Sequence, residues 1–464
     1  MQNTSPPPII LLASPVYWPQ ESERSQLAEA VAGELRGAVA GIGGVTVVDG
    51  PDALDRLTGG DGQARVLVPL SGGVQPWMAR IAESSPALGL FNGYLPEALP
   101  EPLAGRLMHA NAHPACTDFH AHCRLHGKPI EWLSTLAELG EFIAAATAAA
   151  SLRGARLLKI GETEPWVINS CRDPATIRAR MGTEVIPLER DQLYAVVGEI
   201  SDSEARAEAE AWLATRPELL DIGRADIEQA CRVTAAMRKL LADHRADGLS
   251  MACFAMIGDI DTTSCLALSA LNSSATSIGA CEGDLDAALT LLLLKSLGAD
   301  FVWIANPIIH PGDYVDLAHC TAPVCGCGRT FPFRLMRHHE SGRGVSPEVQ
   351  LPDGETATAA RLSVNAGRIV AHQGITERRE KLPACHTQIR LHVASSRRLL
   401  DSLPGTHLVL SFGNYLRRLE MTAAQLGLEF AGSGMPADNS PRRQPPTANS
   451  ATSADSPSRS PYAT

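Results

Sequence analysis

An alternation of apolar strand-like runs with amphipathic helical stretches dominates the first two thirds of the chain. Near the start, an apolar run over 9–18 is followed by a helical pattern over 22–42, and another apolar run follows at 64–73. Such an alternation is typical of an open parallel sheet flanked by helices. A last helical pattern over 134–154 ends this unit, and we expect an N-terminal α/β domain over residues 1–153.

The same pattern begins again after residue 154. Apolar runs at 248–258, 276–281 and 300–307 predict further strands, and the stretch between the last two, 284–297, predicts a helix. A second α/β domain is therefore expected over residues 154–312.

Beyond residue 312 the pattern changes to short β-like runs separated by glycine and proline. This pattern of short runs predicts a β-rich, barrel-like C-terminal domain over 313–430. Residues 431–464 are rich in Pro, Ser, Ala and Thr, and we expect a disordered tail because such a segment buries too little apolar surface to order itself. The predicted fold class is α/β, with two Rossmann-like parallel-sheet domains followed by a β-barrel-like domain.

Charge and cysteine content narrow the classes of function. The formal net charge is −11, which argues against nucleic acid as a partner, since phosphate binding needs clustered Lys and Arg. The eleven cysteines show no framework spacing and no signal peptide opens the chain, so we expect reduced thiols in the cytoplasm. The most apolar run, at 287–298, is interrupted by Lys295 and is too short to cross a membrane.

Polar residues follow two predicted strands of the second α/β domain. Glu282 comes directly after the run at 276–281, and Asn306 lies at the end of the run at 300–307. Ligands of open α/β sheets gather at the carboxyl ends of strands, so these side chains are candidates for one crevice. Alternatively, Glu282 begins the next helix, where a carboxylate stabilises free N–H groups. His407, after a Pro-Gly turn, is a third candidate, although a structural histidine also fits that position.

The stretch "HCTAPVCGCGRTFPF" groups one histidine with three cysteines within nine positions: His319, Cys320, Cys325 and Cys327. A redox or soft-metal thiol site is one interpretation. Zinc sites usually show two separated Cys/His pairs, and that spacing is missing here. Buried reduced thiols are the alternative.

The stretch "RHHESGRGV", residues 337–345, combines adjacent histidines, an acid and two glycines in a predicted loop. His339 and Glu340 are its candidates for contact with a polar ligand. A solvated turn is the alternative.

Several motifs together resemble one family. The segments "ACEGDLDAALTLLLLKSL", "HCTAP", "RHHESGRGV", "CHTQIRLHV" and "PGTHLVLSFGN" occur in the order found in the L-fucose isomerase-like family, whose broader group includes L-arabinose isomerase. The resemblance covers residues 8–430 in architecture and is specific in the second half of the chain. It implies a homo-oligomer, a trimer or hexamer, acting on a small-molecule substrate.

In that family a divalent ion, usually manganese (Mn2+), is held by a Glu, an Asp and a His, and the two acids move protons between neighbouring carbons through an enediol. The resemblance implies that Glu282 is the glutamate, that Asn306 stands where the aspartate is expected and that His407 is the histidine. An asparagine can still coordinate a hard ion through its carbonyl oxygen, but it cannot accept a proton. The chain also has Thr406 and Leu408 where the family has Asn and His.

These observations predict a metal-dependent, isomerase-like enzyme that acts on a sugar-like or hydroxycarbonyl substrate, with Glu282 and Asn306 as catalytic residues and His407 as a further metal ligand. Residues expected to contact the substrate are Asp284, His319, His339 and Glu340. Two alternatives stay open. One is a divergent lyase or specialised-metabolism enzyme that uses the thiols of Cys320, Cys325 and Cys327, and the other is a non-catalytic ligand-binding protein.

Overall fold

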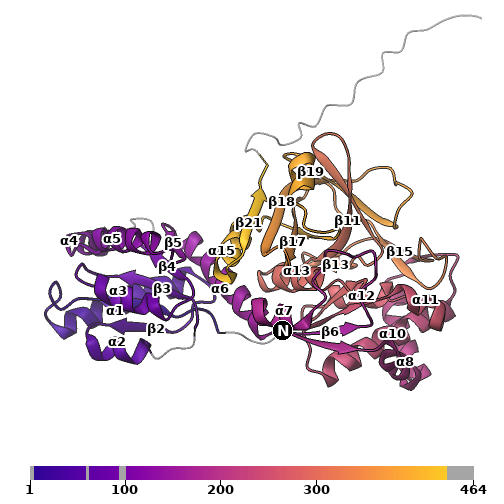
Figure 1. The fold of residues 1–464 in the computed structure, drawn as a ribbon, viewed down its shortest axis with the longest axis horizontal. Coiled ribbons are helices and arrows are strands. Elements are labelled where there is room, and N and C mark those ends of the chain that lie inside the picture. The colour runs from indigo at the N-terminus through magenta and orange to yellow at the C-terminus, as the bar shows by residue number, and fades with distance from the viewer. Residues whose placement is uncertain (1–4, 59–61, 93–100, 436–464) are drawn as a thin grey trace, which may run out of the picture.

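The computed structural model describes residues 5–58, 62–92 and 101–435, which form two parallel sheets, a closed barrel and two small sheets. Figure 1 places the first parallel sheet and its helices at one end of the molecule, and the second sheet and the barrel together at the other. The expected α/β fold with a C-terminal barrel is confirmed. Of the predicted tail, residues 436–464 lie outside the described residues, and strand β21 (Glu429–Ser433) includes its first positions.

The first sheet contains β1 (Ile9–Leu12), β2 (Val45–Val48), β3 (Arg65–Pro69), β4 (Leu88–Phe91) and β5 (Ile130–Leu133). Its strands lie in the order β2-β1-β3-β4-β5, and all neighbours run parallel. The accompanying helices are α1 (Glu21–Ala38), α2 (Pro51–Thr58), α3 (Gln75–Glu83), α4 (Glu101–His109), α5 (Ala112–Leu125) and α6 (Leu136–Gly154). Alternate residues of β1 belong to two different apolar clusters because helices cover both faces of the sheet.

The second sheet contains β6 (Arg156–Ile160), β7 (Glu184–Leu188), β9 (Gly248–Met251) and β10 (Ile278–Cys281). It is also parallel throughout, in the order β10-β9-β6-β7. Its helices are α7 (Pro174–Met181), α8 (Arg190–Glu199), α9 (Asp202–Ala214), α10 (Arg224–Asp243), α11 (Phe254–Ile260), α12 (Cys265–Asn272) and α13 (Leu285–Ser296).

The barrel contains β11 (Trp303–Ile309), β12 (Tyr314–His319), β17 (Thr356–Ser363), β18 (Arg368–Glu377), β19 (Thr387–Val393) and β20 (Leu408–Phe412). These strands pair antiparallel in the order β17-β20-β11-β12-β19-β18, and β18 pairs with β17 to close the ring. Two helices, α14 (Ser396–Ser402) and α15 (Leu416–Leu426), follow barrel strands. The small sheets are a hairpin of β13 (Cys325–Gly326) and β14 (Arg329–Thr330), and an arm of β8 (Glu218–Leu220), β15 (Phe333–Met336) and β16 (Ser346–Val349).

The strand predicted at 300–307 forms, but its expected place in the second parallel sheet is wrong. It is β11, and it pairs antiparallel with β12 and β20 inside the barrel, with Asn306 opposite Ala318. A buried strand is apolar at nearly every position whether it lies in a parallel sheet or in a barrel, so its composition does not identify its partners. Asn306 is therefore a barrel residue and does not end a parallel strand.

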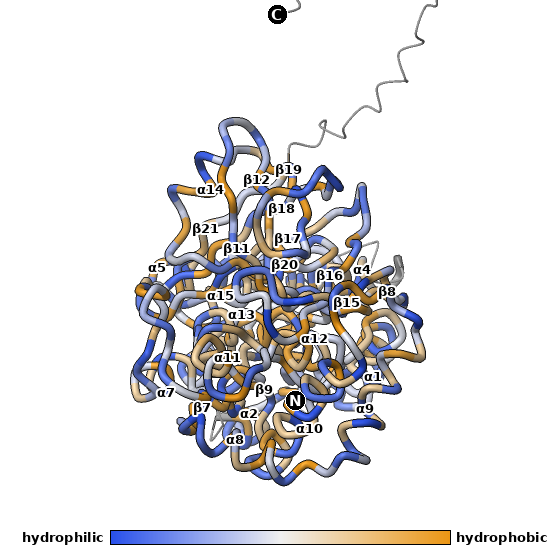
Figure 2. Tube along the Cα trace, turned by 90° about the vertical axis from the view of Figure 1, so that its right-hand side faces the viewer, coloured by the Kyte–Doolittle hydropathy of each residue, from blue (hydrophilic) through white to orange (hydrophobic). Residues whose placement is uncertain are grey.

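Helix α13 connects the second sheet to the barrel and is buried from Leu285 to Lys295. It packs against β9 and β10 on one side and against β11, β17 and β20 on the other, so the residues just before it lie where the sheet meets the barrel. In Figure 2, α12 and α13 lie near the middle of the molecule, as their apolar sequences require. Among the described helices, none is both long and apolar enough to span a bilayer.

Candidate active site

Glu282 follows β10 directly, at the carboxyl end of the second sheet. Its φ is 60°, in the left-handed region that side chains rarely adopt, and Gly283 continues there with φ of 66°. A Cβ on Gly283 would lie 2.7 Å from Thr163 Cα, so glycine is required by close backbone approach. Glu164 N–H donates to the Glu282 carbonyl at 3.0 Å and holds the turn. A non-glycine residue kept in this conformation marks a candidate functional position.

The alternative in which Glu282 begins the next helix is wrong. Asp284 is the N-cap of α13, and its Oδ1 accepts a hydrogen bond from Ala287 N–H at 2.9 Å. The Glu282 carboxylate instead faces two barrel histidines.

A carboxylate and two imidazoles converge at the junction of sheet and barrel. Glu282 Oε1 lies 3.6 Å from His407 Nε2 and 3.8 Å from His319 Nε2, and all three side chains are buried. Glu282 comes from the end of β10, His319 is the last residue of β12, and His407 directly precedes β20. Because their ligand atoms lie within 4.8 Å of one another, we call these three residues the Glu–His–His cluster.

Asp284 contacts His407 at Nδ1, the ring nitrogen that does not face Glu282, and Arg361 contacts both Asp284 and His407. His407 Nδ1 lies 2.8 Å from Asp284 Oδ2, which also accepts from Arg361 Nη1 at 3.0 Å, and Arg361 Nη1 donates to the His407 carbonyl at 2.9 Å. A carboxylate on one ring nitrogen sets the orientation of the imidazole and leaves the other nitrogen for a ligand. Both Asp284 oxygens are engaged within the protein and its side chain is fully buried, so its contacts in this structure are with His407, Arg361 and Ser170, and its contact with a substrate stays a prediction.

The electrostatics of the cluster keep its acid ionised. Burial acts to raise the pKa of Glu282, but the neighbouring imidazoles of His319 and His407 outweigh burial and hold that pKa below its usual range. For His407, burial acts to lower the pKa, whereas Asp284 and Glu282 raise it to about 9. An ionised carboxylate and a neutral imidazole are the forms that ligate a cation, so an ion bound here would displace the proton from His407 Nε2.

The Glu–His–His cluster fits the divalent ion that the sequence resemblance implies. His407 Nε2 is buried and has no hydrogen-bond partner among the described residues, and it points toward the Glu282 carboxylate. A buried polar atom without a partner is costly, and a cation would supply one. One carboxylate and two imidazoles form a donor set that suits first-row divalent ions.

Asn306 lies beside this cluster in the barrel. It is half-buried on β11, next to Ala305, which pairs with Leu408 of β20. Its Oδ1 accepts a hydrogen bond from Thr406 Oγ1 at 3.5 Å. Asn306 is therefore near His407, and its role as a ligand stays a prediction.

The loop over residues 337–345 buries a different histidine from the one expected. His338 is 5% exposed, whereas His339 and Glu340 are exposed. The chain turns back after His338, whose carbonyl accepts from Gly342 N–H at 2.9 Å, and His339 and Glu340 lie in that turn. Burial lowers the pKa of His338 to about 4.

The three cysteines predicted as a thiol site are not brought together. Cys320 is buried, and its Sγ lies 3.3 Å from Cys265 Sγ. Cys325 Sγ contacts the Ser273 carbonyl at 3.6 Å, and Cys327 is exposed. In the part of the chain that the structure describes, Cys325 and Cys327 belong to no cluster of metal-ligating groups.

Trp166 and Glu164, which follow β6 in the chain, adjoin the cluster, and sequence reasoning did not identify them. Trp166 Nε1 donates to Glu282 Oε2 at 2.6 Å, while half of the indole is exposed. Glu164 is 8% exposed, and its Oε1 accepts from Phe254 N–H at 3.1 Å. The signal that could have found both is their place at the carboxyl end of a parallel strand, the same rule that selected Glu282.

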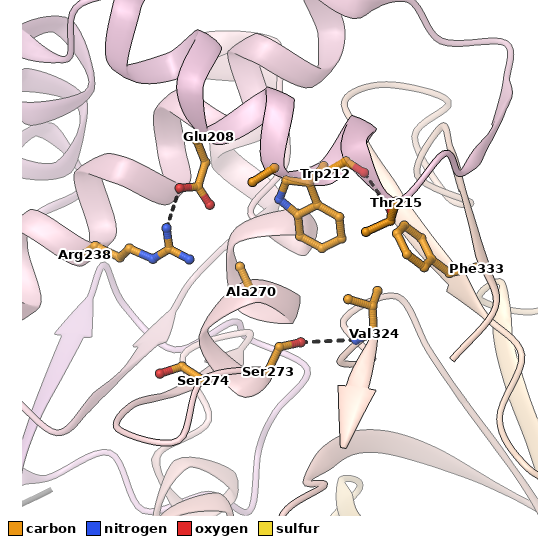
Figure 3. Close-up of a pocket in the computed structure, with 10 residues that line it drawn as sticks. Glu208, Trp212, Thr215, Arg238, Ala270, Ser273, Ser274, Val324 and Phe333 are labelled. Atoms are coloured by element: carbon orange, nitrogen blue, oxygen red, sulfur yellow. Dashed lines mark hydrogen bonds and ion pairs between the residues drawn. The ribbon is translucent and has the colours of Figure 1, made fainter. Parts of the chain in front are cut away.

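A cavity of about 300 Å³ lies apart from the cluster, between α9, α10 and α12. Figure 3 shows Trp212 and Phe333 as an edge-to-face pair on one side of it and Arg238 paired with Glu208 on the other. No member of the Glu–His–His cluster lines this cavity, so it adds nothing to that site.

Comparisons with known proteins give a distant relationship. No family model matches the chain. Sulfoquinovose isomerase from Alkalicoccus urumqiensis is 21% identical over 204 residues, which cover 43% of this chain and 45% of that protein. The chain therefore matches less than half the length of this relative. The similarity indicates a distant relationship to a sugar isomerase and does not single out the L-fucose isomerase-like family.

Proposed function

We propose that this protein is a sugar isomerase that moves a carbonyl group between neighbouring carbons of a small polyhydroxylated substrate. The observation that carries the proposal is the buried Glu–His–His cluster, whose members come from one parallel sheet and two barrel strands. The similarity to a sugar isomerase supports the substrate class. The alternative lyase or specialised-metabolism enzyme, which would use three thiols, is not supported because those thiols lie apart in the structure.

Glu282, His319 and His407 would hold a divalent ion, with manganese as the first candidate from the sequence resemblance and the Asn306 amide oxygen as an additional neighbour. Such an ion, when bound, polarises neighbouring carbonyl and hydroxyl oxygens of a substrate and makes the intervening C–H group more acidic. His319 takes the place of the expected aspartate as the third ligand, which gives a donor set richer in nitrogen than the resemblance implies.

The protein's own acids would move the proton. Asn306 cannot accept one, so a two-acid mechanism needs another carboxyl group. Glu164 supplies one, because its backbone is hydrogen-bonded to Glu282 and its side chain is buried beside the same turn. We assign Glu282 and Glu164 as the pair that removes and returns the proton.

Trp166 would hold the sugar in place. Its indole N–H is used by Glu282, and its exposed ring surface lies beside the cluster. An aromatic face packs against the C–H side of a sugar ring and excludes water from the reacting carbons. Ile168, on the same loop, is 74% exposed, and a neighbouring subunit covering this loop would fit the proposed homo-oligomer.

The test is isomerisation in heavy water by the purified protein, with and without added manganese. Sulfoquinovose and neutral aldoses are offered separately, and NMR follows ketose formation and deuterium at the carbon next to the carbonyl. We expect deuterium incorporation that depends on the metal and is lost in Glu282→Gln. Binding of a sugar without any exchange would overturn the proposal and favour the non-catalytic alternative.

A further inference from the structure

A second group of metal-ligating side chains lies next to the Glu–His–His cluster. Cys265, Cys320 and His338 have ligand atoms within 4.8 Å of one another, and all three residues are at least 95% buried. Cys265 is the first residue of α12, Cys320 follows β12, and His338 follows β15. The group therefore joins the second sheet's helices, the barrel and the β15–β16 arm.

We propose that Cys265, Cys320 and His338 bind a second cation of the thiophilic class, zinc by its donor set. The two sulfur atoms lie 3.3 Å apart. Around a tetrahedral zinc with Zn–S bonds of about 2.3 Å, two sulfurs lie about 3.8 Å apart, so a small outward shift of each side chain accommodates the ion. Soft thiolates together with an imidazole select zinc over manganese, which prefers oxygen ligands.

A fourth ligand is within reach. Cys385, two residues before β19, is half-buried and lies near enough to Cys320 to influence the pKa of that thiol. Three thiolates and one imidazole complete a closed structural zinc site. The imidazole is already oriented, because His338 Nδ1 lies 3.0 Å from Ser341 Oγ and leaves Nε2 for the ion. The exposed Glu340 carboxylate, 3.5 Å from Nε2, is the neighbour that the ion would displace.

This second site would stabilise the fold and hold the catalytic histidine in place. The ion would close long loops of the chain, since Cys265 and Cys320 are 55 positions apart. Binding free energy at a site that exists only in the folded state adds to folding stability. Cys320 directly follows His319, whose Nδ1 lies 3.8 Å from Cys320 Sγ, so fixing the cysteine also fixes the histidine.

Cobalt substitution separates the two sites. Cobalt held by thiolates gives an intense sulfur-to-metal charge-transfer band in the near ultraviolet, and cobalt held by a carboxylate and imidazoles gives none. The full-length protein is stripped with a chelator under reducing conditions, reloaded with cobalt and then titrated with zinc. We expect a band that saturates at one cobalt per chain, disappears as zinc is added, and persists in Glu282→Gln.

Cys265→Ser and Cys320→Ser should each lose most of the band, and stripping zinc from the wild type should lower its melting temperature by ~5 °C or more. Cys231→Ser is the matched control, because Cys231 is a fully buried thiol of α10 outside the cluster, and it should keep the band. No charge-transfer band in the reduced wild type, or an unchanged band in Cys320→Ser, would overturn the proposal.

Native mass spectrometry provides a second measurement that does not depend on the folding of the variants. One zinc per chain in the purified wild type supports the site, while a mass lower by two hydrogens, from a disulfide between Cys265 and Cys320, contradicts it. The outcome is independent of the proposed reaction. Glu282→Gln removes isomerisation and keeps the zinc, whereas a failure of the second site leaves the Glu–His–His cluster and its turnover as proposed.

Discussion

The two parallel sheets share one architecture and differ at their carboxyl ends. In the first sheet, Ser14 and Ser71 come after β1 and β3, and Ser14 N–H donates to Ser71 Oγ at 2.8 Å. In the second sheet, Glu164 and Glu282 come after β6 and β10, and Glu282 faces two barrel histidines. At the first edge this bond joins two residues of the same sheet unit, whereas at the second edge the Glu282 carboxylate meets side chains that come from the barrel.

The difference comes from what packs on each edge. The barrel packs on α13 and brings His319 and His407 to the carboxyl end of β10. A parallel sheet provides a place where ligands can gather, but the chemistry depends on the side chains that a second unit adds there.

The largest effect is expected for Glu282→Gln against Ser71→Ala, one change at each carboxyl edge. Loss of the proton-transferring carboxylate should reduce kcat of the metal-loaded enzyme by about 10³-fold or more. Ser71→Ala removes a neutral hydroxyl far from the cluster and should leave kcat within about twofold. Steady-state kinetics measure both, and equal losses would remove the functional distinction between the sheets.

The next effect concerns stability and compares two arginine–aspartate pairs. Arg361 and Asp284 are both fully buried, so Arg361→Met removes the guanidinium beside a buried acid and should cost about 3–5 kcal/mol. In the first unit, Arg24 pairs with Asp49, whose side chain is 38% exposed, and donates to the Trp18 carbonyl, so Arg24→Met should cost about 1–2 kcal/mol. Urea unfolding gives both values, and a larger loss in Arg24→Met would contradict the contrast.

A smaller effect on turnover should distinguish two acids of one loop. Glu164→Gln should lower kcat by about 10²-fold, because the proposed second proton carrier is lost. Glu162→Gln is the control, since the side chain of Glu162 is 85% exposed and pairs with Lys159, and its kcat should be unchanged. If Asn306→Asp restores turnover to Glu164→Gln, the two positions serve one role. Unchanged kcat in Glu164→Gln would remove Glu164 from the mechanism.

The smallest effect is a pH dependence that arises in the barrel. His372 is 2% exposed and lies between Ser402 and Ser433, and burial lowers its pKa to about 4. The unfolded chain binds this proton near pH 6.5, so stability is full above that pH and is lost as the pH falls toward 4. Between pH 7 and pH 5 this histidine should contribute about 2 kcal/mol of the loss.

His372→Gln should flatten this part of the stability curve while keeping a hydrogen-bonding side chain. His122→Gln is the control from the first unit, because His122 is exposed on α5, and it should leave the curve unchanged. Urea unfolding at a series of pH values measures the slopes. An unchanged slope in His372→Gln would contradict the assignment.

Sequence reasoning identified the individual strands and helices more completely than the partners with which they pair and pack. Period and composition predicted β1, β3, β9 and β10, the helix after Glu282 and the short β runs of the C-terminal region, but they missed β4 and β5, and part of the strand predicted at 248–258 is helix α11. The same reasoning put the strand of Asn306 in the wrong sheet, because an apolar run does not carry the identity of its partner. It selected His339 and Glu340 in the loop and left out His338, because the sequence of a turn does not show which of its side chains the rest of the fold buries.

The sequence by itself determined that an acid leaves a buried strand at residue 282, since local apolar periodicity and glycine placement are written in neighbouring residues. Only the tertiary structure decided what that acid meets. His319, His407 and Arg361 come from strands that are far apart in the chain, and the closure of the barrel brings them to one point. Contacts of this kind depend on pairing and packing across the whole fold, which no local pattern encodes.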